Sequence, residues 1–268
     1  MKIALIGYGN WGKKIFINLK KIFQFKIIIF RKKYTNRKKN NFILTKVNIL
    51  KKYNFKAIIS ATNYKMHEKL CLFCLKNNIP GFIEKPLTKT MKIFSKIEKI
   101  KNYKKNIMHI NYIYKKYIEY LGIKKNKITK IILFMGSASN NSSYRYNLWD
   151  WGTHCLSILF YLNSTGLKKI LLKKKFKNFF LKCKFKNGLI GLCYFGNCFD
   201  KSVKILKIIY SDRKVKIINF NKTEYNKTPL VNSLNLFFRD INKKNNNIRD
   251  IDLSKKITRV LIKLKNYA

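Results

Sequence analysis

The first 23 residues contain a pattern that few folds can accommodate. A short apolar run, residues 2–6, leads into Gly7-Tyr8-Gly9-Asn10-Trp11-Gly12, and residues 13–23 carry apolar side chains at helical spacing. The glycines permit a tight turn and the close approach of a pyrophosphate, which then lies at the helix N-terminus. A strand, this turn and a helix therefore predict a dinucleotide-binding unit in which residues 7–12 contact the cofactor.

The end of the second predicted strand, residues 25–30, bears on which dinucleotide is bound. Arg31 stands 19 residues beyond Gly12, near the position where NAD-binding folds carry an acidic residue for the ribose 2′-hydroxyl. A cation at this position suits a 2′-phosphate instead. The sequence therefore predicts NADP or NAD as the cofactor, with NADP favoured.

Polar and charged residues also lie at or just beyond the further strands predicted in the N-terminal half, residues 57–61, 82–83 and 107–110. Ligands bind at the carboxyl ends of the strands in an open parallel sheet. Lys85 precedes Pro86 and is expected to point into the cofactor cleft; the alternative is an ordinary lysine before a turn proline. The candidate cofactor residues at these positions are Thr62, Asn63, His67, Glu84, Lys85 and His109.

The stretch Leu148-Trp149-Asp150-Trp151-Gly152-Thr153-His154 concentrates residue types that are rare in this chain, which has only three His and three Trp. The apolar residues that follow predict a buried helix over 150–162 that begins at this stretch. Asp150 and His154 are four residues apart, so they would share one helix face. An acid that orients an imidazole is a workable general base. The alternative is a capping Asp followed by a core His.

The C-terminal half changes character from alternating strands and helices to a run of strands. Strands are predicted over 130–135, 170–172, 178–185, 189–194, 202–210 and 214–220, and Asn187-Gly188 is a hairpin turn signal. Further helices are predicted over 230–242 and 254–264. We therefore expect an α/β protein with an N-terminal Rossmann domain and parallel sheet, residues 1–113. A C-terminal α+β domain with an open, mainly antiparallel sheet, residues 114–268, would follow.

The formal net charge of +49 invites a nucleic-acid interpretation, but only seven of the 60 basic residues are Arg, the residue favoured for bidentate recognition of bases and phosphates. Lysine is spread over every segment together with Asn, Ile, Phe and Tyr, as AT-rich codons produce. We therefore expect no specific nucleic-acid partner. Apolar runs are too short to span a membrane and no signal peptide is recognisable, so a cytoplasmic protein is expected. Cys71-x-x-Cys74 lacks a second pair, so no metal is expected.

Taken together, these motifs resemble the oxidoreductase family of glucose–fructose oxidoreductase, inositol dehydrogenase and the rhizopine-catabolism protein (Gfo/Idh/MocA). The resemblance implies a nucleotide-binding domain followed by an α/β domain whose open sheet commonly forms the oligomer interface. It also implies that Lys85 contacts nicotinamide and the substrate hydroxyl, and that Asp150 and His154 face the sugar. The matching stretches are 4–12, 60–62 with His67, 84–87 and 148–154.

This chain departs from the family pattern at two positions, of which the first is minor and the second bears on the cofactor. Asn63 replaces the family's usual Pro, and Arg31 replaces its acid after the second strand, which leaves NAD in doubt. Residues 147–159 look most like the branch that oxidises nucleotide-linked amino sugars.

The expected function is an NAD(P)-dependent transfer of hydride between nicotinamide and a secondary alcohol of a sugar, nucleotide sugar or cyclitol. Lys85, Asp150 and His154 are the expected catalytic residues. The partners expected are a small sugar-like substrate and further copies of the chain, as a dimer or tetramer through the C-terminal sheet. The alternatives are a catalytically decayed NAD(P)-binding module and a basic nucleic-acid-binding protein.

Overall fold

The computed structural model describes residues 1–31, 41–43, 47–138, 144–176, 178–224 and 227–265. The chain forms two compact units: Met1–Asn111 with Ser233–Thr258, and Tyr112–Asn232 with Arg259–Ala268. The first stretch of the first unit ends two residues before the expected domain boundary. Its second stretch comes from the C-terminal part of the chain. The domain ranges 1–113 and 114–268 themselves remain a prediction.

The first unit is built on a six-stranded sheet whose described pairs are all parallel. The strand order is β3-β2-β1-β4-β5-β6, which is that of a dinucleotide-binding Rossmann fold. The order reverses between β1 and β4, the point where such sheets bind their ligand. The strands are β1 (Lys2–Ile6), β2 (Lys26–Arg31), β3 (Asn41–Ile43), β4 (Ala57–Ser60), β5 (Gly81–Ile83) and β6 (Met108–Ile110).

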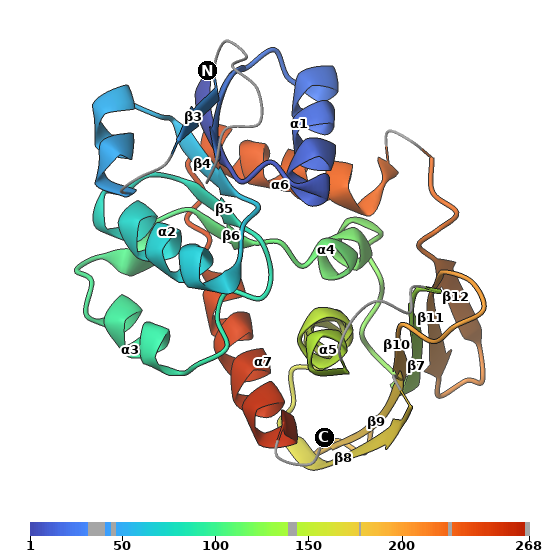
Figure 1. The fold of residues 1–268 in the computed structure, drawn as a ribbon. Coiled ribbons are helices and arrows are strands. Elements are labelled where there is room, and N and C mark those ends of the chain that lie inside the picture. Colours follow the sequence, from blue (N-terminus) through green and yellow to red (C-terminus); the bar gives the residue numbers. More distant parts are fainter. Residues whose placement is uncertain (32–40, 44–46, 139–143, 177, 225–226, 266–268) are drawn as a thin grey trace. The chain divides into compact units, whose positions relative to one another are not determined.

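Helices cover both faces of this sheet. Every residue of β4, β5 and β6 is buried, as expected for parallel strands between two helical layers. Figure 1 shows α1 and α2 on opposite sides of the strands. The helices that belong wholly to this unit are α1 (Asn10–Ile22), α2 (Tyr64–Lys76), α3 (Lys92–Glu98) and the 3₁₀ helices η1 (Val47–Tyr53) and η2 (Tyr103–Lys105).

Two C-terminal helices, α6 (Pro229–Asn242) and α7 (Arg249–Lys265), are each divided between the units. Phe237 of α6 packs against Phe82 of β5 with ring centroids 5.4 Å apart. Its neighbour Phe238 packs against Phe23 and Phe25, which join α1 to β2. These rings explain why a late segment of the chain completes the core of the first unit.

The second unit contains a six-stranded sheet of order β12-β11-β7-β10-β9-β8. β7 and β10 are parallel, whereas the other neighbouring pairs are antiparallel. This confirms the mainly antiparallel sheet, and the predicted turn at Asn187-Gly188 joins β9 to β10. The strands are β7 (Ile128–Gly136), β8 (Leu167–Lys175), β9 (Asn178–Phe185), β10 (Ile190–Gly196), β11 (Val203–Tyr210) and β12 (Val215–Asn219).

One face of this second sheet is covered by α5 (Tyr144–Leu162), the longest helix of the unit, which lies in the curve of the strands (Figure 1). Burial alternates along β9 as the pleat requires, with Phe179, Leu181, Cys183 and Phe185 facing inward. Gly191 of β10 permits close approach, because a Cβ there would lie 2.7 Å from Leu159. The short helix α4 (Ile113–Tyr120) belongs to the same unit.

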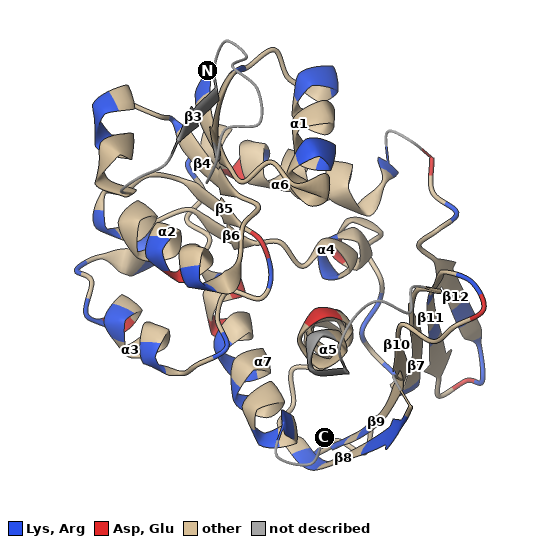
Figure 2. Cartoon of the chain, in the orientation of Figure 1, with Lys and Arg blue, Asp and Glu red and all other residues tan. Residues whose placement is uncertain are grey.

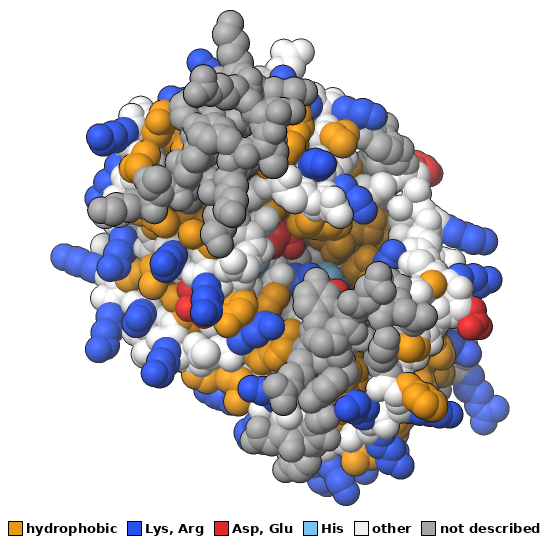
Figure 3. Space-filling model, in the orientation of Figure 1, with side chains coloured by type: hydrophobic (Ala, Val, Ile, Leu, Met, Phe, Trp, Pro, Cys, Tyr) orange, Lys and Arg blue, Asp and Glu red, His pale blue; other side chains and the backbone are white. Residues whose placement is uncertain are grey.

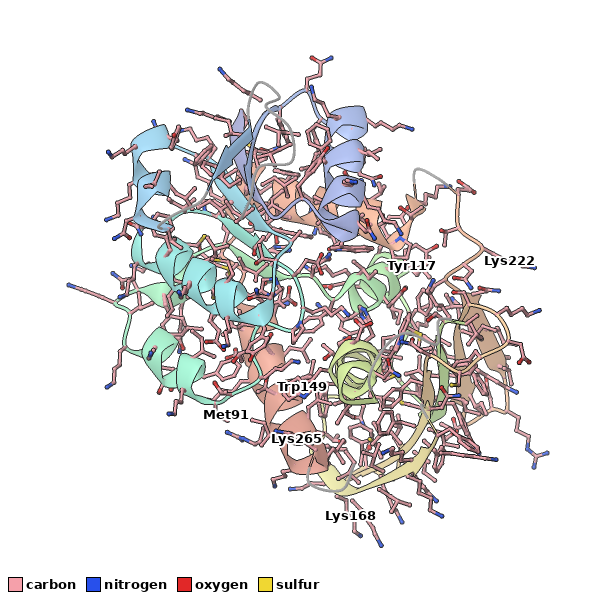
Figure 4. The ribbon with its side chains drawn as sticks, in the orientation of Figure 1. Met91, Tyr117, Trp149, Lys168, Lys222 and Lys265 are labelled. Carbon is pink, nitrogen blue, oxygen red and sulfur yellow. The ribbon has the colours of Figure 1, made fainter. Side chains whose placement is uncertain are left out.

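Basic side chains are distributed over the helices and strands of both units (Figure 2). On the face shown in Figure 3 they are interspersed with hydrophobic and other side chains rather than collected into one field. Lys168 and Lys222, labelled in Figure 4, extend outward from the second unit. No helix in the described ranges is both long and apolar enough to cross a membrane.

Candidate active site

The glycine turn after β1 is shaped by close packing at two positions and by open space at the third. A Cβ at Gly7, whose φ is +92°, would lie 2.3 Å from the carbonyl oxygen of Ala61. A Cβ at Gly12 would lie 2.3 Å from the oxygen of Gly7. At Gly9, by contrast, none of the described atoms lies within 4 Å of such a Cβ. The turn therefore packs against the residues that follow β4 and leaves Gly9 facing space that a bound group can occupy.

The first turn of α1 is available to an anion. Its N-cap residue is Gly9, which has no side chain to accept from the first backbone N–H groups of the helix. α2 differs, because the Asn63 side chain accepts a hydrogen bond from the Met66 N–H at 3.1 Å. That cap gives Asn63, which replaces the family's Pro, a structural role. The open turn and the uncapped helix fit a dinucleotide pyrophosphate.

Two other residues expected at the cofactor lie at the carboxyl ends of the strands on either side of β1. Thr62 follows β4, and its hydroxyl lies 3.0 Å from that of Ser60. Arg31 is the last residue of β2, but its side chain lies outside the described part of the chain. The preference for NADP therefore stays a prediction.

His67 is buried in α2 beside the turn that carries Lys85. Its Nδ1 lies 2.9 Å from the carbonyl oxygen of Pro86. Burial lowers the pKa of His67 to about 4, while the backbone carbonyls of Pro86 and Thr62 raise it in part and the Lys85 charge lowers it further. His67 is therefore neutral near pH 7, and a neutral ring with Nδ1 protonated can donate to Pro86. Its contact with the cofactor stays a prediction.

Glu84 and Lys85 follow β5, two strands along from the glycine turn. Glu84 is buried, and its Oε1 accepts hydrogen bonds from Trp11 Nε1 and Asn111 Nδ2, each at 2.5 Å. Burial raises the pKa of Glu84, and these bonds together with the Lys85 charge lower it in part. Lys85 itself is half-buried, and its peptide bond to Pro86 is cis. The turn thus holds an ammonium beside a buried carboxylate.

His109 lies within β6, where the structure brings it to two C-terminal residues of the first unit. Its Nε2 lies 2.9 Å from Asp240 Oδ2, and Asn247 donates to the same oxygen at 2.9 Å. Hydrogen bonds from His109 and Asn247 hold the pKa of Asp240 at about 2, although burial alone would raise it. These contacts give His109 a structural role in joining β6 to α6. Its expected contact with the cofactor remains a prediction.

The Asp150–His154 pair lies inside α5 rather than at its start. The predicted helix start at Asp150 is wrong, because α5 begins at Tyr144. Asp150 is therefore no N-cap, and the interpretation of this pair as a capping Asp with a core His loses its first half. The tryptophan before the pair, Trp149, is labelled in Figure 4 and buried. His154 is buried and Asp150 half-buried, and their spacing places both on one helix face.

Aromatic rings surround His154 within the second unit. Tyr114 of α4 meets the imidazole edge to face, with ring centroids 4.8 Å apart, and Trp151 lies at 6.2 Å. Burial and the nearby charge of Asp150 both raise the pKa of Tyr114, so this hydroxyl stays protonated. Sequence reasoning missed Tyr114, since one tyrosine among sixteen in a helix that had not been predicted gave no signal.

A second missed set fixes the first half of α5 to the sheet. Asn197, just after β10, donates to Asn147 Oδ1 at 2.7 Å. Its own Oδ1 accepts from Trp151 Nε1 at 2.8 Å and from Ser137 at 2.9 Å. Asn147 and Trp151 flank Asp150 on the helix. Asparagine is too frequent in this chain for either position to have stood out.

The expected site residues therefore fall into two groups. Those for the cofactor and Lys85 belong to the first unit, and Asp150 and His154 belong to the second. Each group is assembled within its own unit. Among the described residues, no group of three or more His, Cys, Asp or Glu is placed to hold a metal ion. Cys71 and Cys74 are buried in α2, and burial raises the pKa of the Cys71 thiol to about 12.

Neither protein-family profiles nor curated protein sequences show a significant match to this chain. Solved structures do. Myo-inositol dehydrogenase from Corynebacterium glutamicum superposes with a TM-score of 0.80 at 9% identity, covering 97% of this chain and 94% of that one. For a Gfo/Idh/MocA family oxidoreductase from Vibrio cholerae the TM-score is 0.77 at 11% identity, covering 98% and 96%.

UDP-N-acetylglucosamine 3-dehydrogenase GnnA from Acidithiobacillus ferrooxidans gives a TM-score of 0.79 at 12% identity, covering 98% of this chain and 96% of that one. This chain has the fold of these Gfo/Idh/MocA-type dehydrogenases. The fold recognition made from the sequence motifs is thereby confirmed. A further similar structure, GenD2 from gentamicin A biosynthesis, is a complex with NAD.

Proposed function

We propose that the protein is an NAD(P)-dependent oxidoreductase that transfers a hydride between nicotinamide and a secondary alcohol of a sugar, nucleotide sugar or cyclitol. The observation that carries this proposal is the open glycine turn at the point where the strand order of the first sheet reverses. Ligands bind at this position in open α/β sheets. Lys85 follows a strand of the same sheet two places away.

The dinucleotide would be held by residues of the first unit. Gly9 and the uncapped first turn of α1 would receive the pyrophosphate, and Thr62 would contact the cofactor from the end of β4. Arg31 would pair with a 2′-phosphate, which is why we favour NADP over NAD. When bound, the nicotinamide ring supplies the acceptor or donor of the hydride.

The chain's own residues would handle the proton and the charge on the substrate oxygen. Oxidation of a carbinol requires its hydroxyl proton to leave with the hydride. A neutral His154, oriented by Asp150, would accept that proton. The ammonium of Lys85 would stabilise the developing alkoxide. Lys85 is the rival candidate for the base, and the two roles are separable by the pH profiles of the single variants.

The class of substrate follows from the similar structures. One acts on myo-inositol and another on UDP-N-acetylglucosamine, as their names state, so we propose a polyhydroxylated ring as the substrate. Trp151, which follows Asp150 and is half-buried, would offer aromatic surface to such a ring. The cytoplasmic location expected from the sequence stays a prediction.

Turnover with a substrate panel tests this function. The purified protein would be incubated with NADP⁺ or NAD⁺ and with UDP-N-acetylglucosamine, myo-inositol or a free hexose, and reduced nicotinamide would be followed by its fluorescence. We expect reduction with at least one of these classes, faster with NADP⁺. Binding of dinucleotide without any turnover would instead support the decayed module. Salt-sensitive binding of nucleic acid without dinucleotide binding would support the third interpretation.

We also propose that two copies associate through the open face of the second sheet. Neighbouring strands place apolar side chains together on the face opposite α5. Tyr194 lies between Phe134, on which it stacks with ring centroids 5.1 Å apart, and Phe180, whose tilted ring has its centroid 4.8 Å away. An exposed apolar area of this kind marks an interaction site. Its most exposed members are Ile217 (64%), Val215 (49%), Leu171 (41%) and Tyr194 (37%).

A further inference from the structure

A buried carboxylate in the first unit has bonds to three separate segments of the chain. Glu84 Oε1 accepts from Trp11, which lies within the glycine motif of residues 7–12 and in the first turn of α1. It also accepts from Asn111, which follows β6, and Oε2 accepts from the Lys85 peptide N–H at 3.3 Å. Glu84 thus connects the glycine motif at the start of α1 to the turn after β5 that carries Lys85.

The rest of this network fixes the orientation of the donors. Ser233 of α6 donates to Asn111 Oδ1 at 2.6 Å, so the amide nitrogen of Asn111 is the atom turned toward Glu84. The Asn111 backbone N–H donates to Ile83 O at 2.8 Å, which holds Asn111 beside the end of β5. The Trp11 indole, the Asn111 amide and the Lys85 peptide N–H all donate to Glu84. An ionised carboxylate, which only accepts, is the group that matches them.

We propose that Glu84 is a positioning residue whose buried carboxylate ties Trp11 and the glycine turn to the Lys85 turn, so that the dinucleotide and the Lys85 ammonium are held in a fixed arrangement. This inference rests on the proposed function for its catalytic consequence. The carboxylate's oxygens are occupied by protein donors, so Glu84 acts through Trp11, Asn111 and Lys85.

Protonation of Glu84 would place an O–H donor on one carboxyl oxygen, against the donors that face it, and would remove the negative charge that strengthens the bonds from Trp11 and Asn111. Burial raises the pKa of Glu84, so this change occurs at a less acidic pH than for an exposed glutamate. Trp11 reports it directly, because the emission of an indole responds to the charge of the group that its N–H contacts. The other two tryptophans, Trp149 and Trp151, belong to the second unit.

The test begins with tryptophan emission of the full-length protein, without cofactor, titrated from neutral to acidic pH. The Trp11 signal is the difference between the wild type and Trp11→Phe, which keeps a ring and deletes the N–H donor. We expect one transition with a midpoint above about 4.3, the value of an exposed Glu, and its absence in Glu84→Gln. A Trp11 signal without a transition, or one that persists in Glu84→Gln, would overturn the proposal.

Lys14→Met is the matched control for this titration. The Lys14 ammonium lies 5.8 Å from the centre of the Trp11 ring, so the variant alters the surroundings of the indole and leaves its bond to Glu84 intact. We expect the transition to stay in place. Its loss in Lys14→Met would show that the signal reports the ring's surroundings and would overturn the assignment to Glu84.

Dinucleotide affinity of the same variants tests the coupling. We expect Trp11→Phe and Glu84→Gln each to weaken NADPH binding about ten-fold, the effect of one charge-assisted hydrogen bond. Because both remove one contact, the double variant should lose much less than the product of the two. A loss of NADPH affinity in the double variant equal to the product of the two single losses would contradict the proposal. If the wild type bound no dinucleotide, the proposed function would fail while the pH titration would still decide the role of Glu84.

Discussion

The two units position their candidate functional residues on different kinds of structural element. In the first unit the relevant residues follow the carboxyl ends of buried parallel strands, and glycines and a carboxylate network determine their positions. In the second, Asp150 and His154 lie on one helix that packs across a sheet with one open face. A site made of strand ends depends on backbone turns, whereas a site on one helix depends on what packs around that helix.

The comparison predicts that each unit supplies something that the other cannot replace. Lys85→Met and His154→Asn should each lower turnover by about 10²–10⁴-fold, because one removes the charge that stabilises the alkoxide and the other removes the proton acceptor. Dinucleotide affinity should stay within a few-fold in both. Steady-state kinetics and a fluorescence titration with NADPH measure the two effects.

Lys168→Met is a suitable control for those variants, because Lys168 is an exposed lysine of β8. It should leave turnover and affinity unchanged. Wild-type turnover in either Lys85→Met or His154→Asn would remove that residue from the mechanism.

Association through the open face of the second sheet should weaken when a charge is introduced into that face. Tyr194→Glu places a carboxylate between Phe134 and Phe180, where association would have to desolvate it. We expect the dimer to dissociate at least about ten-fold more readily, measured by sedimentation velocity over a range of concentrations. Lys51→Glu, an exposed position of the first unit, is the control for charge alone. Equal association of wild type and Tyr194→Glu would place the interface elsewhere.

Turnover should depend on the aromatic ring of Tyr114, which packs against His154 of α5, more than on the Tyr114 hydroxyl. Tyr114→Leu removes the ring edge that meets His154 and should lower kcat about ten-fold with little change in substrate KM. Tyr114→Phe keeps the ring and should stay within about three-fold of wild type. If Tyr114→Phe lost as much activity as Tyr114→Leu, the hydroxyl rather than the ring would be the functional group.

The buried His67, which contacts the Pro86 turn of the first unit, should make the free energy of unfolding depend on pH. The pKa of His67 falls from 6.5 to about 4 on folding, so its contribution is fully present above pH 6.5 and is lost as the pH falls toward 4. We expect a loss of up to about 3 kcal/mol across this window. Burial shifts the pKa of Glu84 in the opposite sense, so acidification stabilises the fold through that group and offsets part of the loss.

His67→Asn isolates the contribution of His67 to the pH dependence of stability, because an amide can still donate to the Pro86 carbonyl but does not titrate. Denaturant unfolding of both proteins at a series of pH values should give a flatter profile for the variant. Parallel profiles would show that His67 is not the group responsible.

Local motifs made the first unit predictable from sequence. The order of strand, glycine turn and helix depends on residues that are adjacent in the chain, and the structure confirms it. The contacts of Glu84 with Trp11 and Asn111 join residues 73 and 27 positions apart. No periodicity or spacing encodes such contacts, so Asn111 was missed. Asn63 shows the reverse case, since a residue that seemed a departure from the family serves as a helix cap.

The structure of the second unit was harder to predict from the sequence, because it depends on contacts between distant segments. Strands with alternating burial were recognised, but their order in the sheet, including the parallel pair of β7 and β10, depends on contacts between distant segments. The start of α5 was placed six residues late because polar residues precede its apolar part. The return of Phe237 and Phe238 to the first unit depends on aromatic packing that the local sequence does not reveal.

The most direct test of the central claim is a crystal structure of the protein with NADP⁺ and a polyhydroxylated substrate. The account predicts that Lys85 Nζ and an imidazole nitrogen of His154 both lie within about 3 Å of one substrate hydroxyl, or one bridging water away, with the carbon of that hydroxyl facing the nicotinamide ring. A bound dinucleotide with either side chain beyond that reach would contradict it.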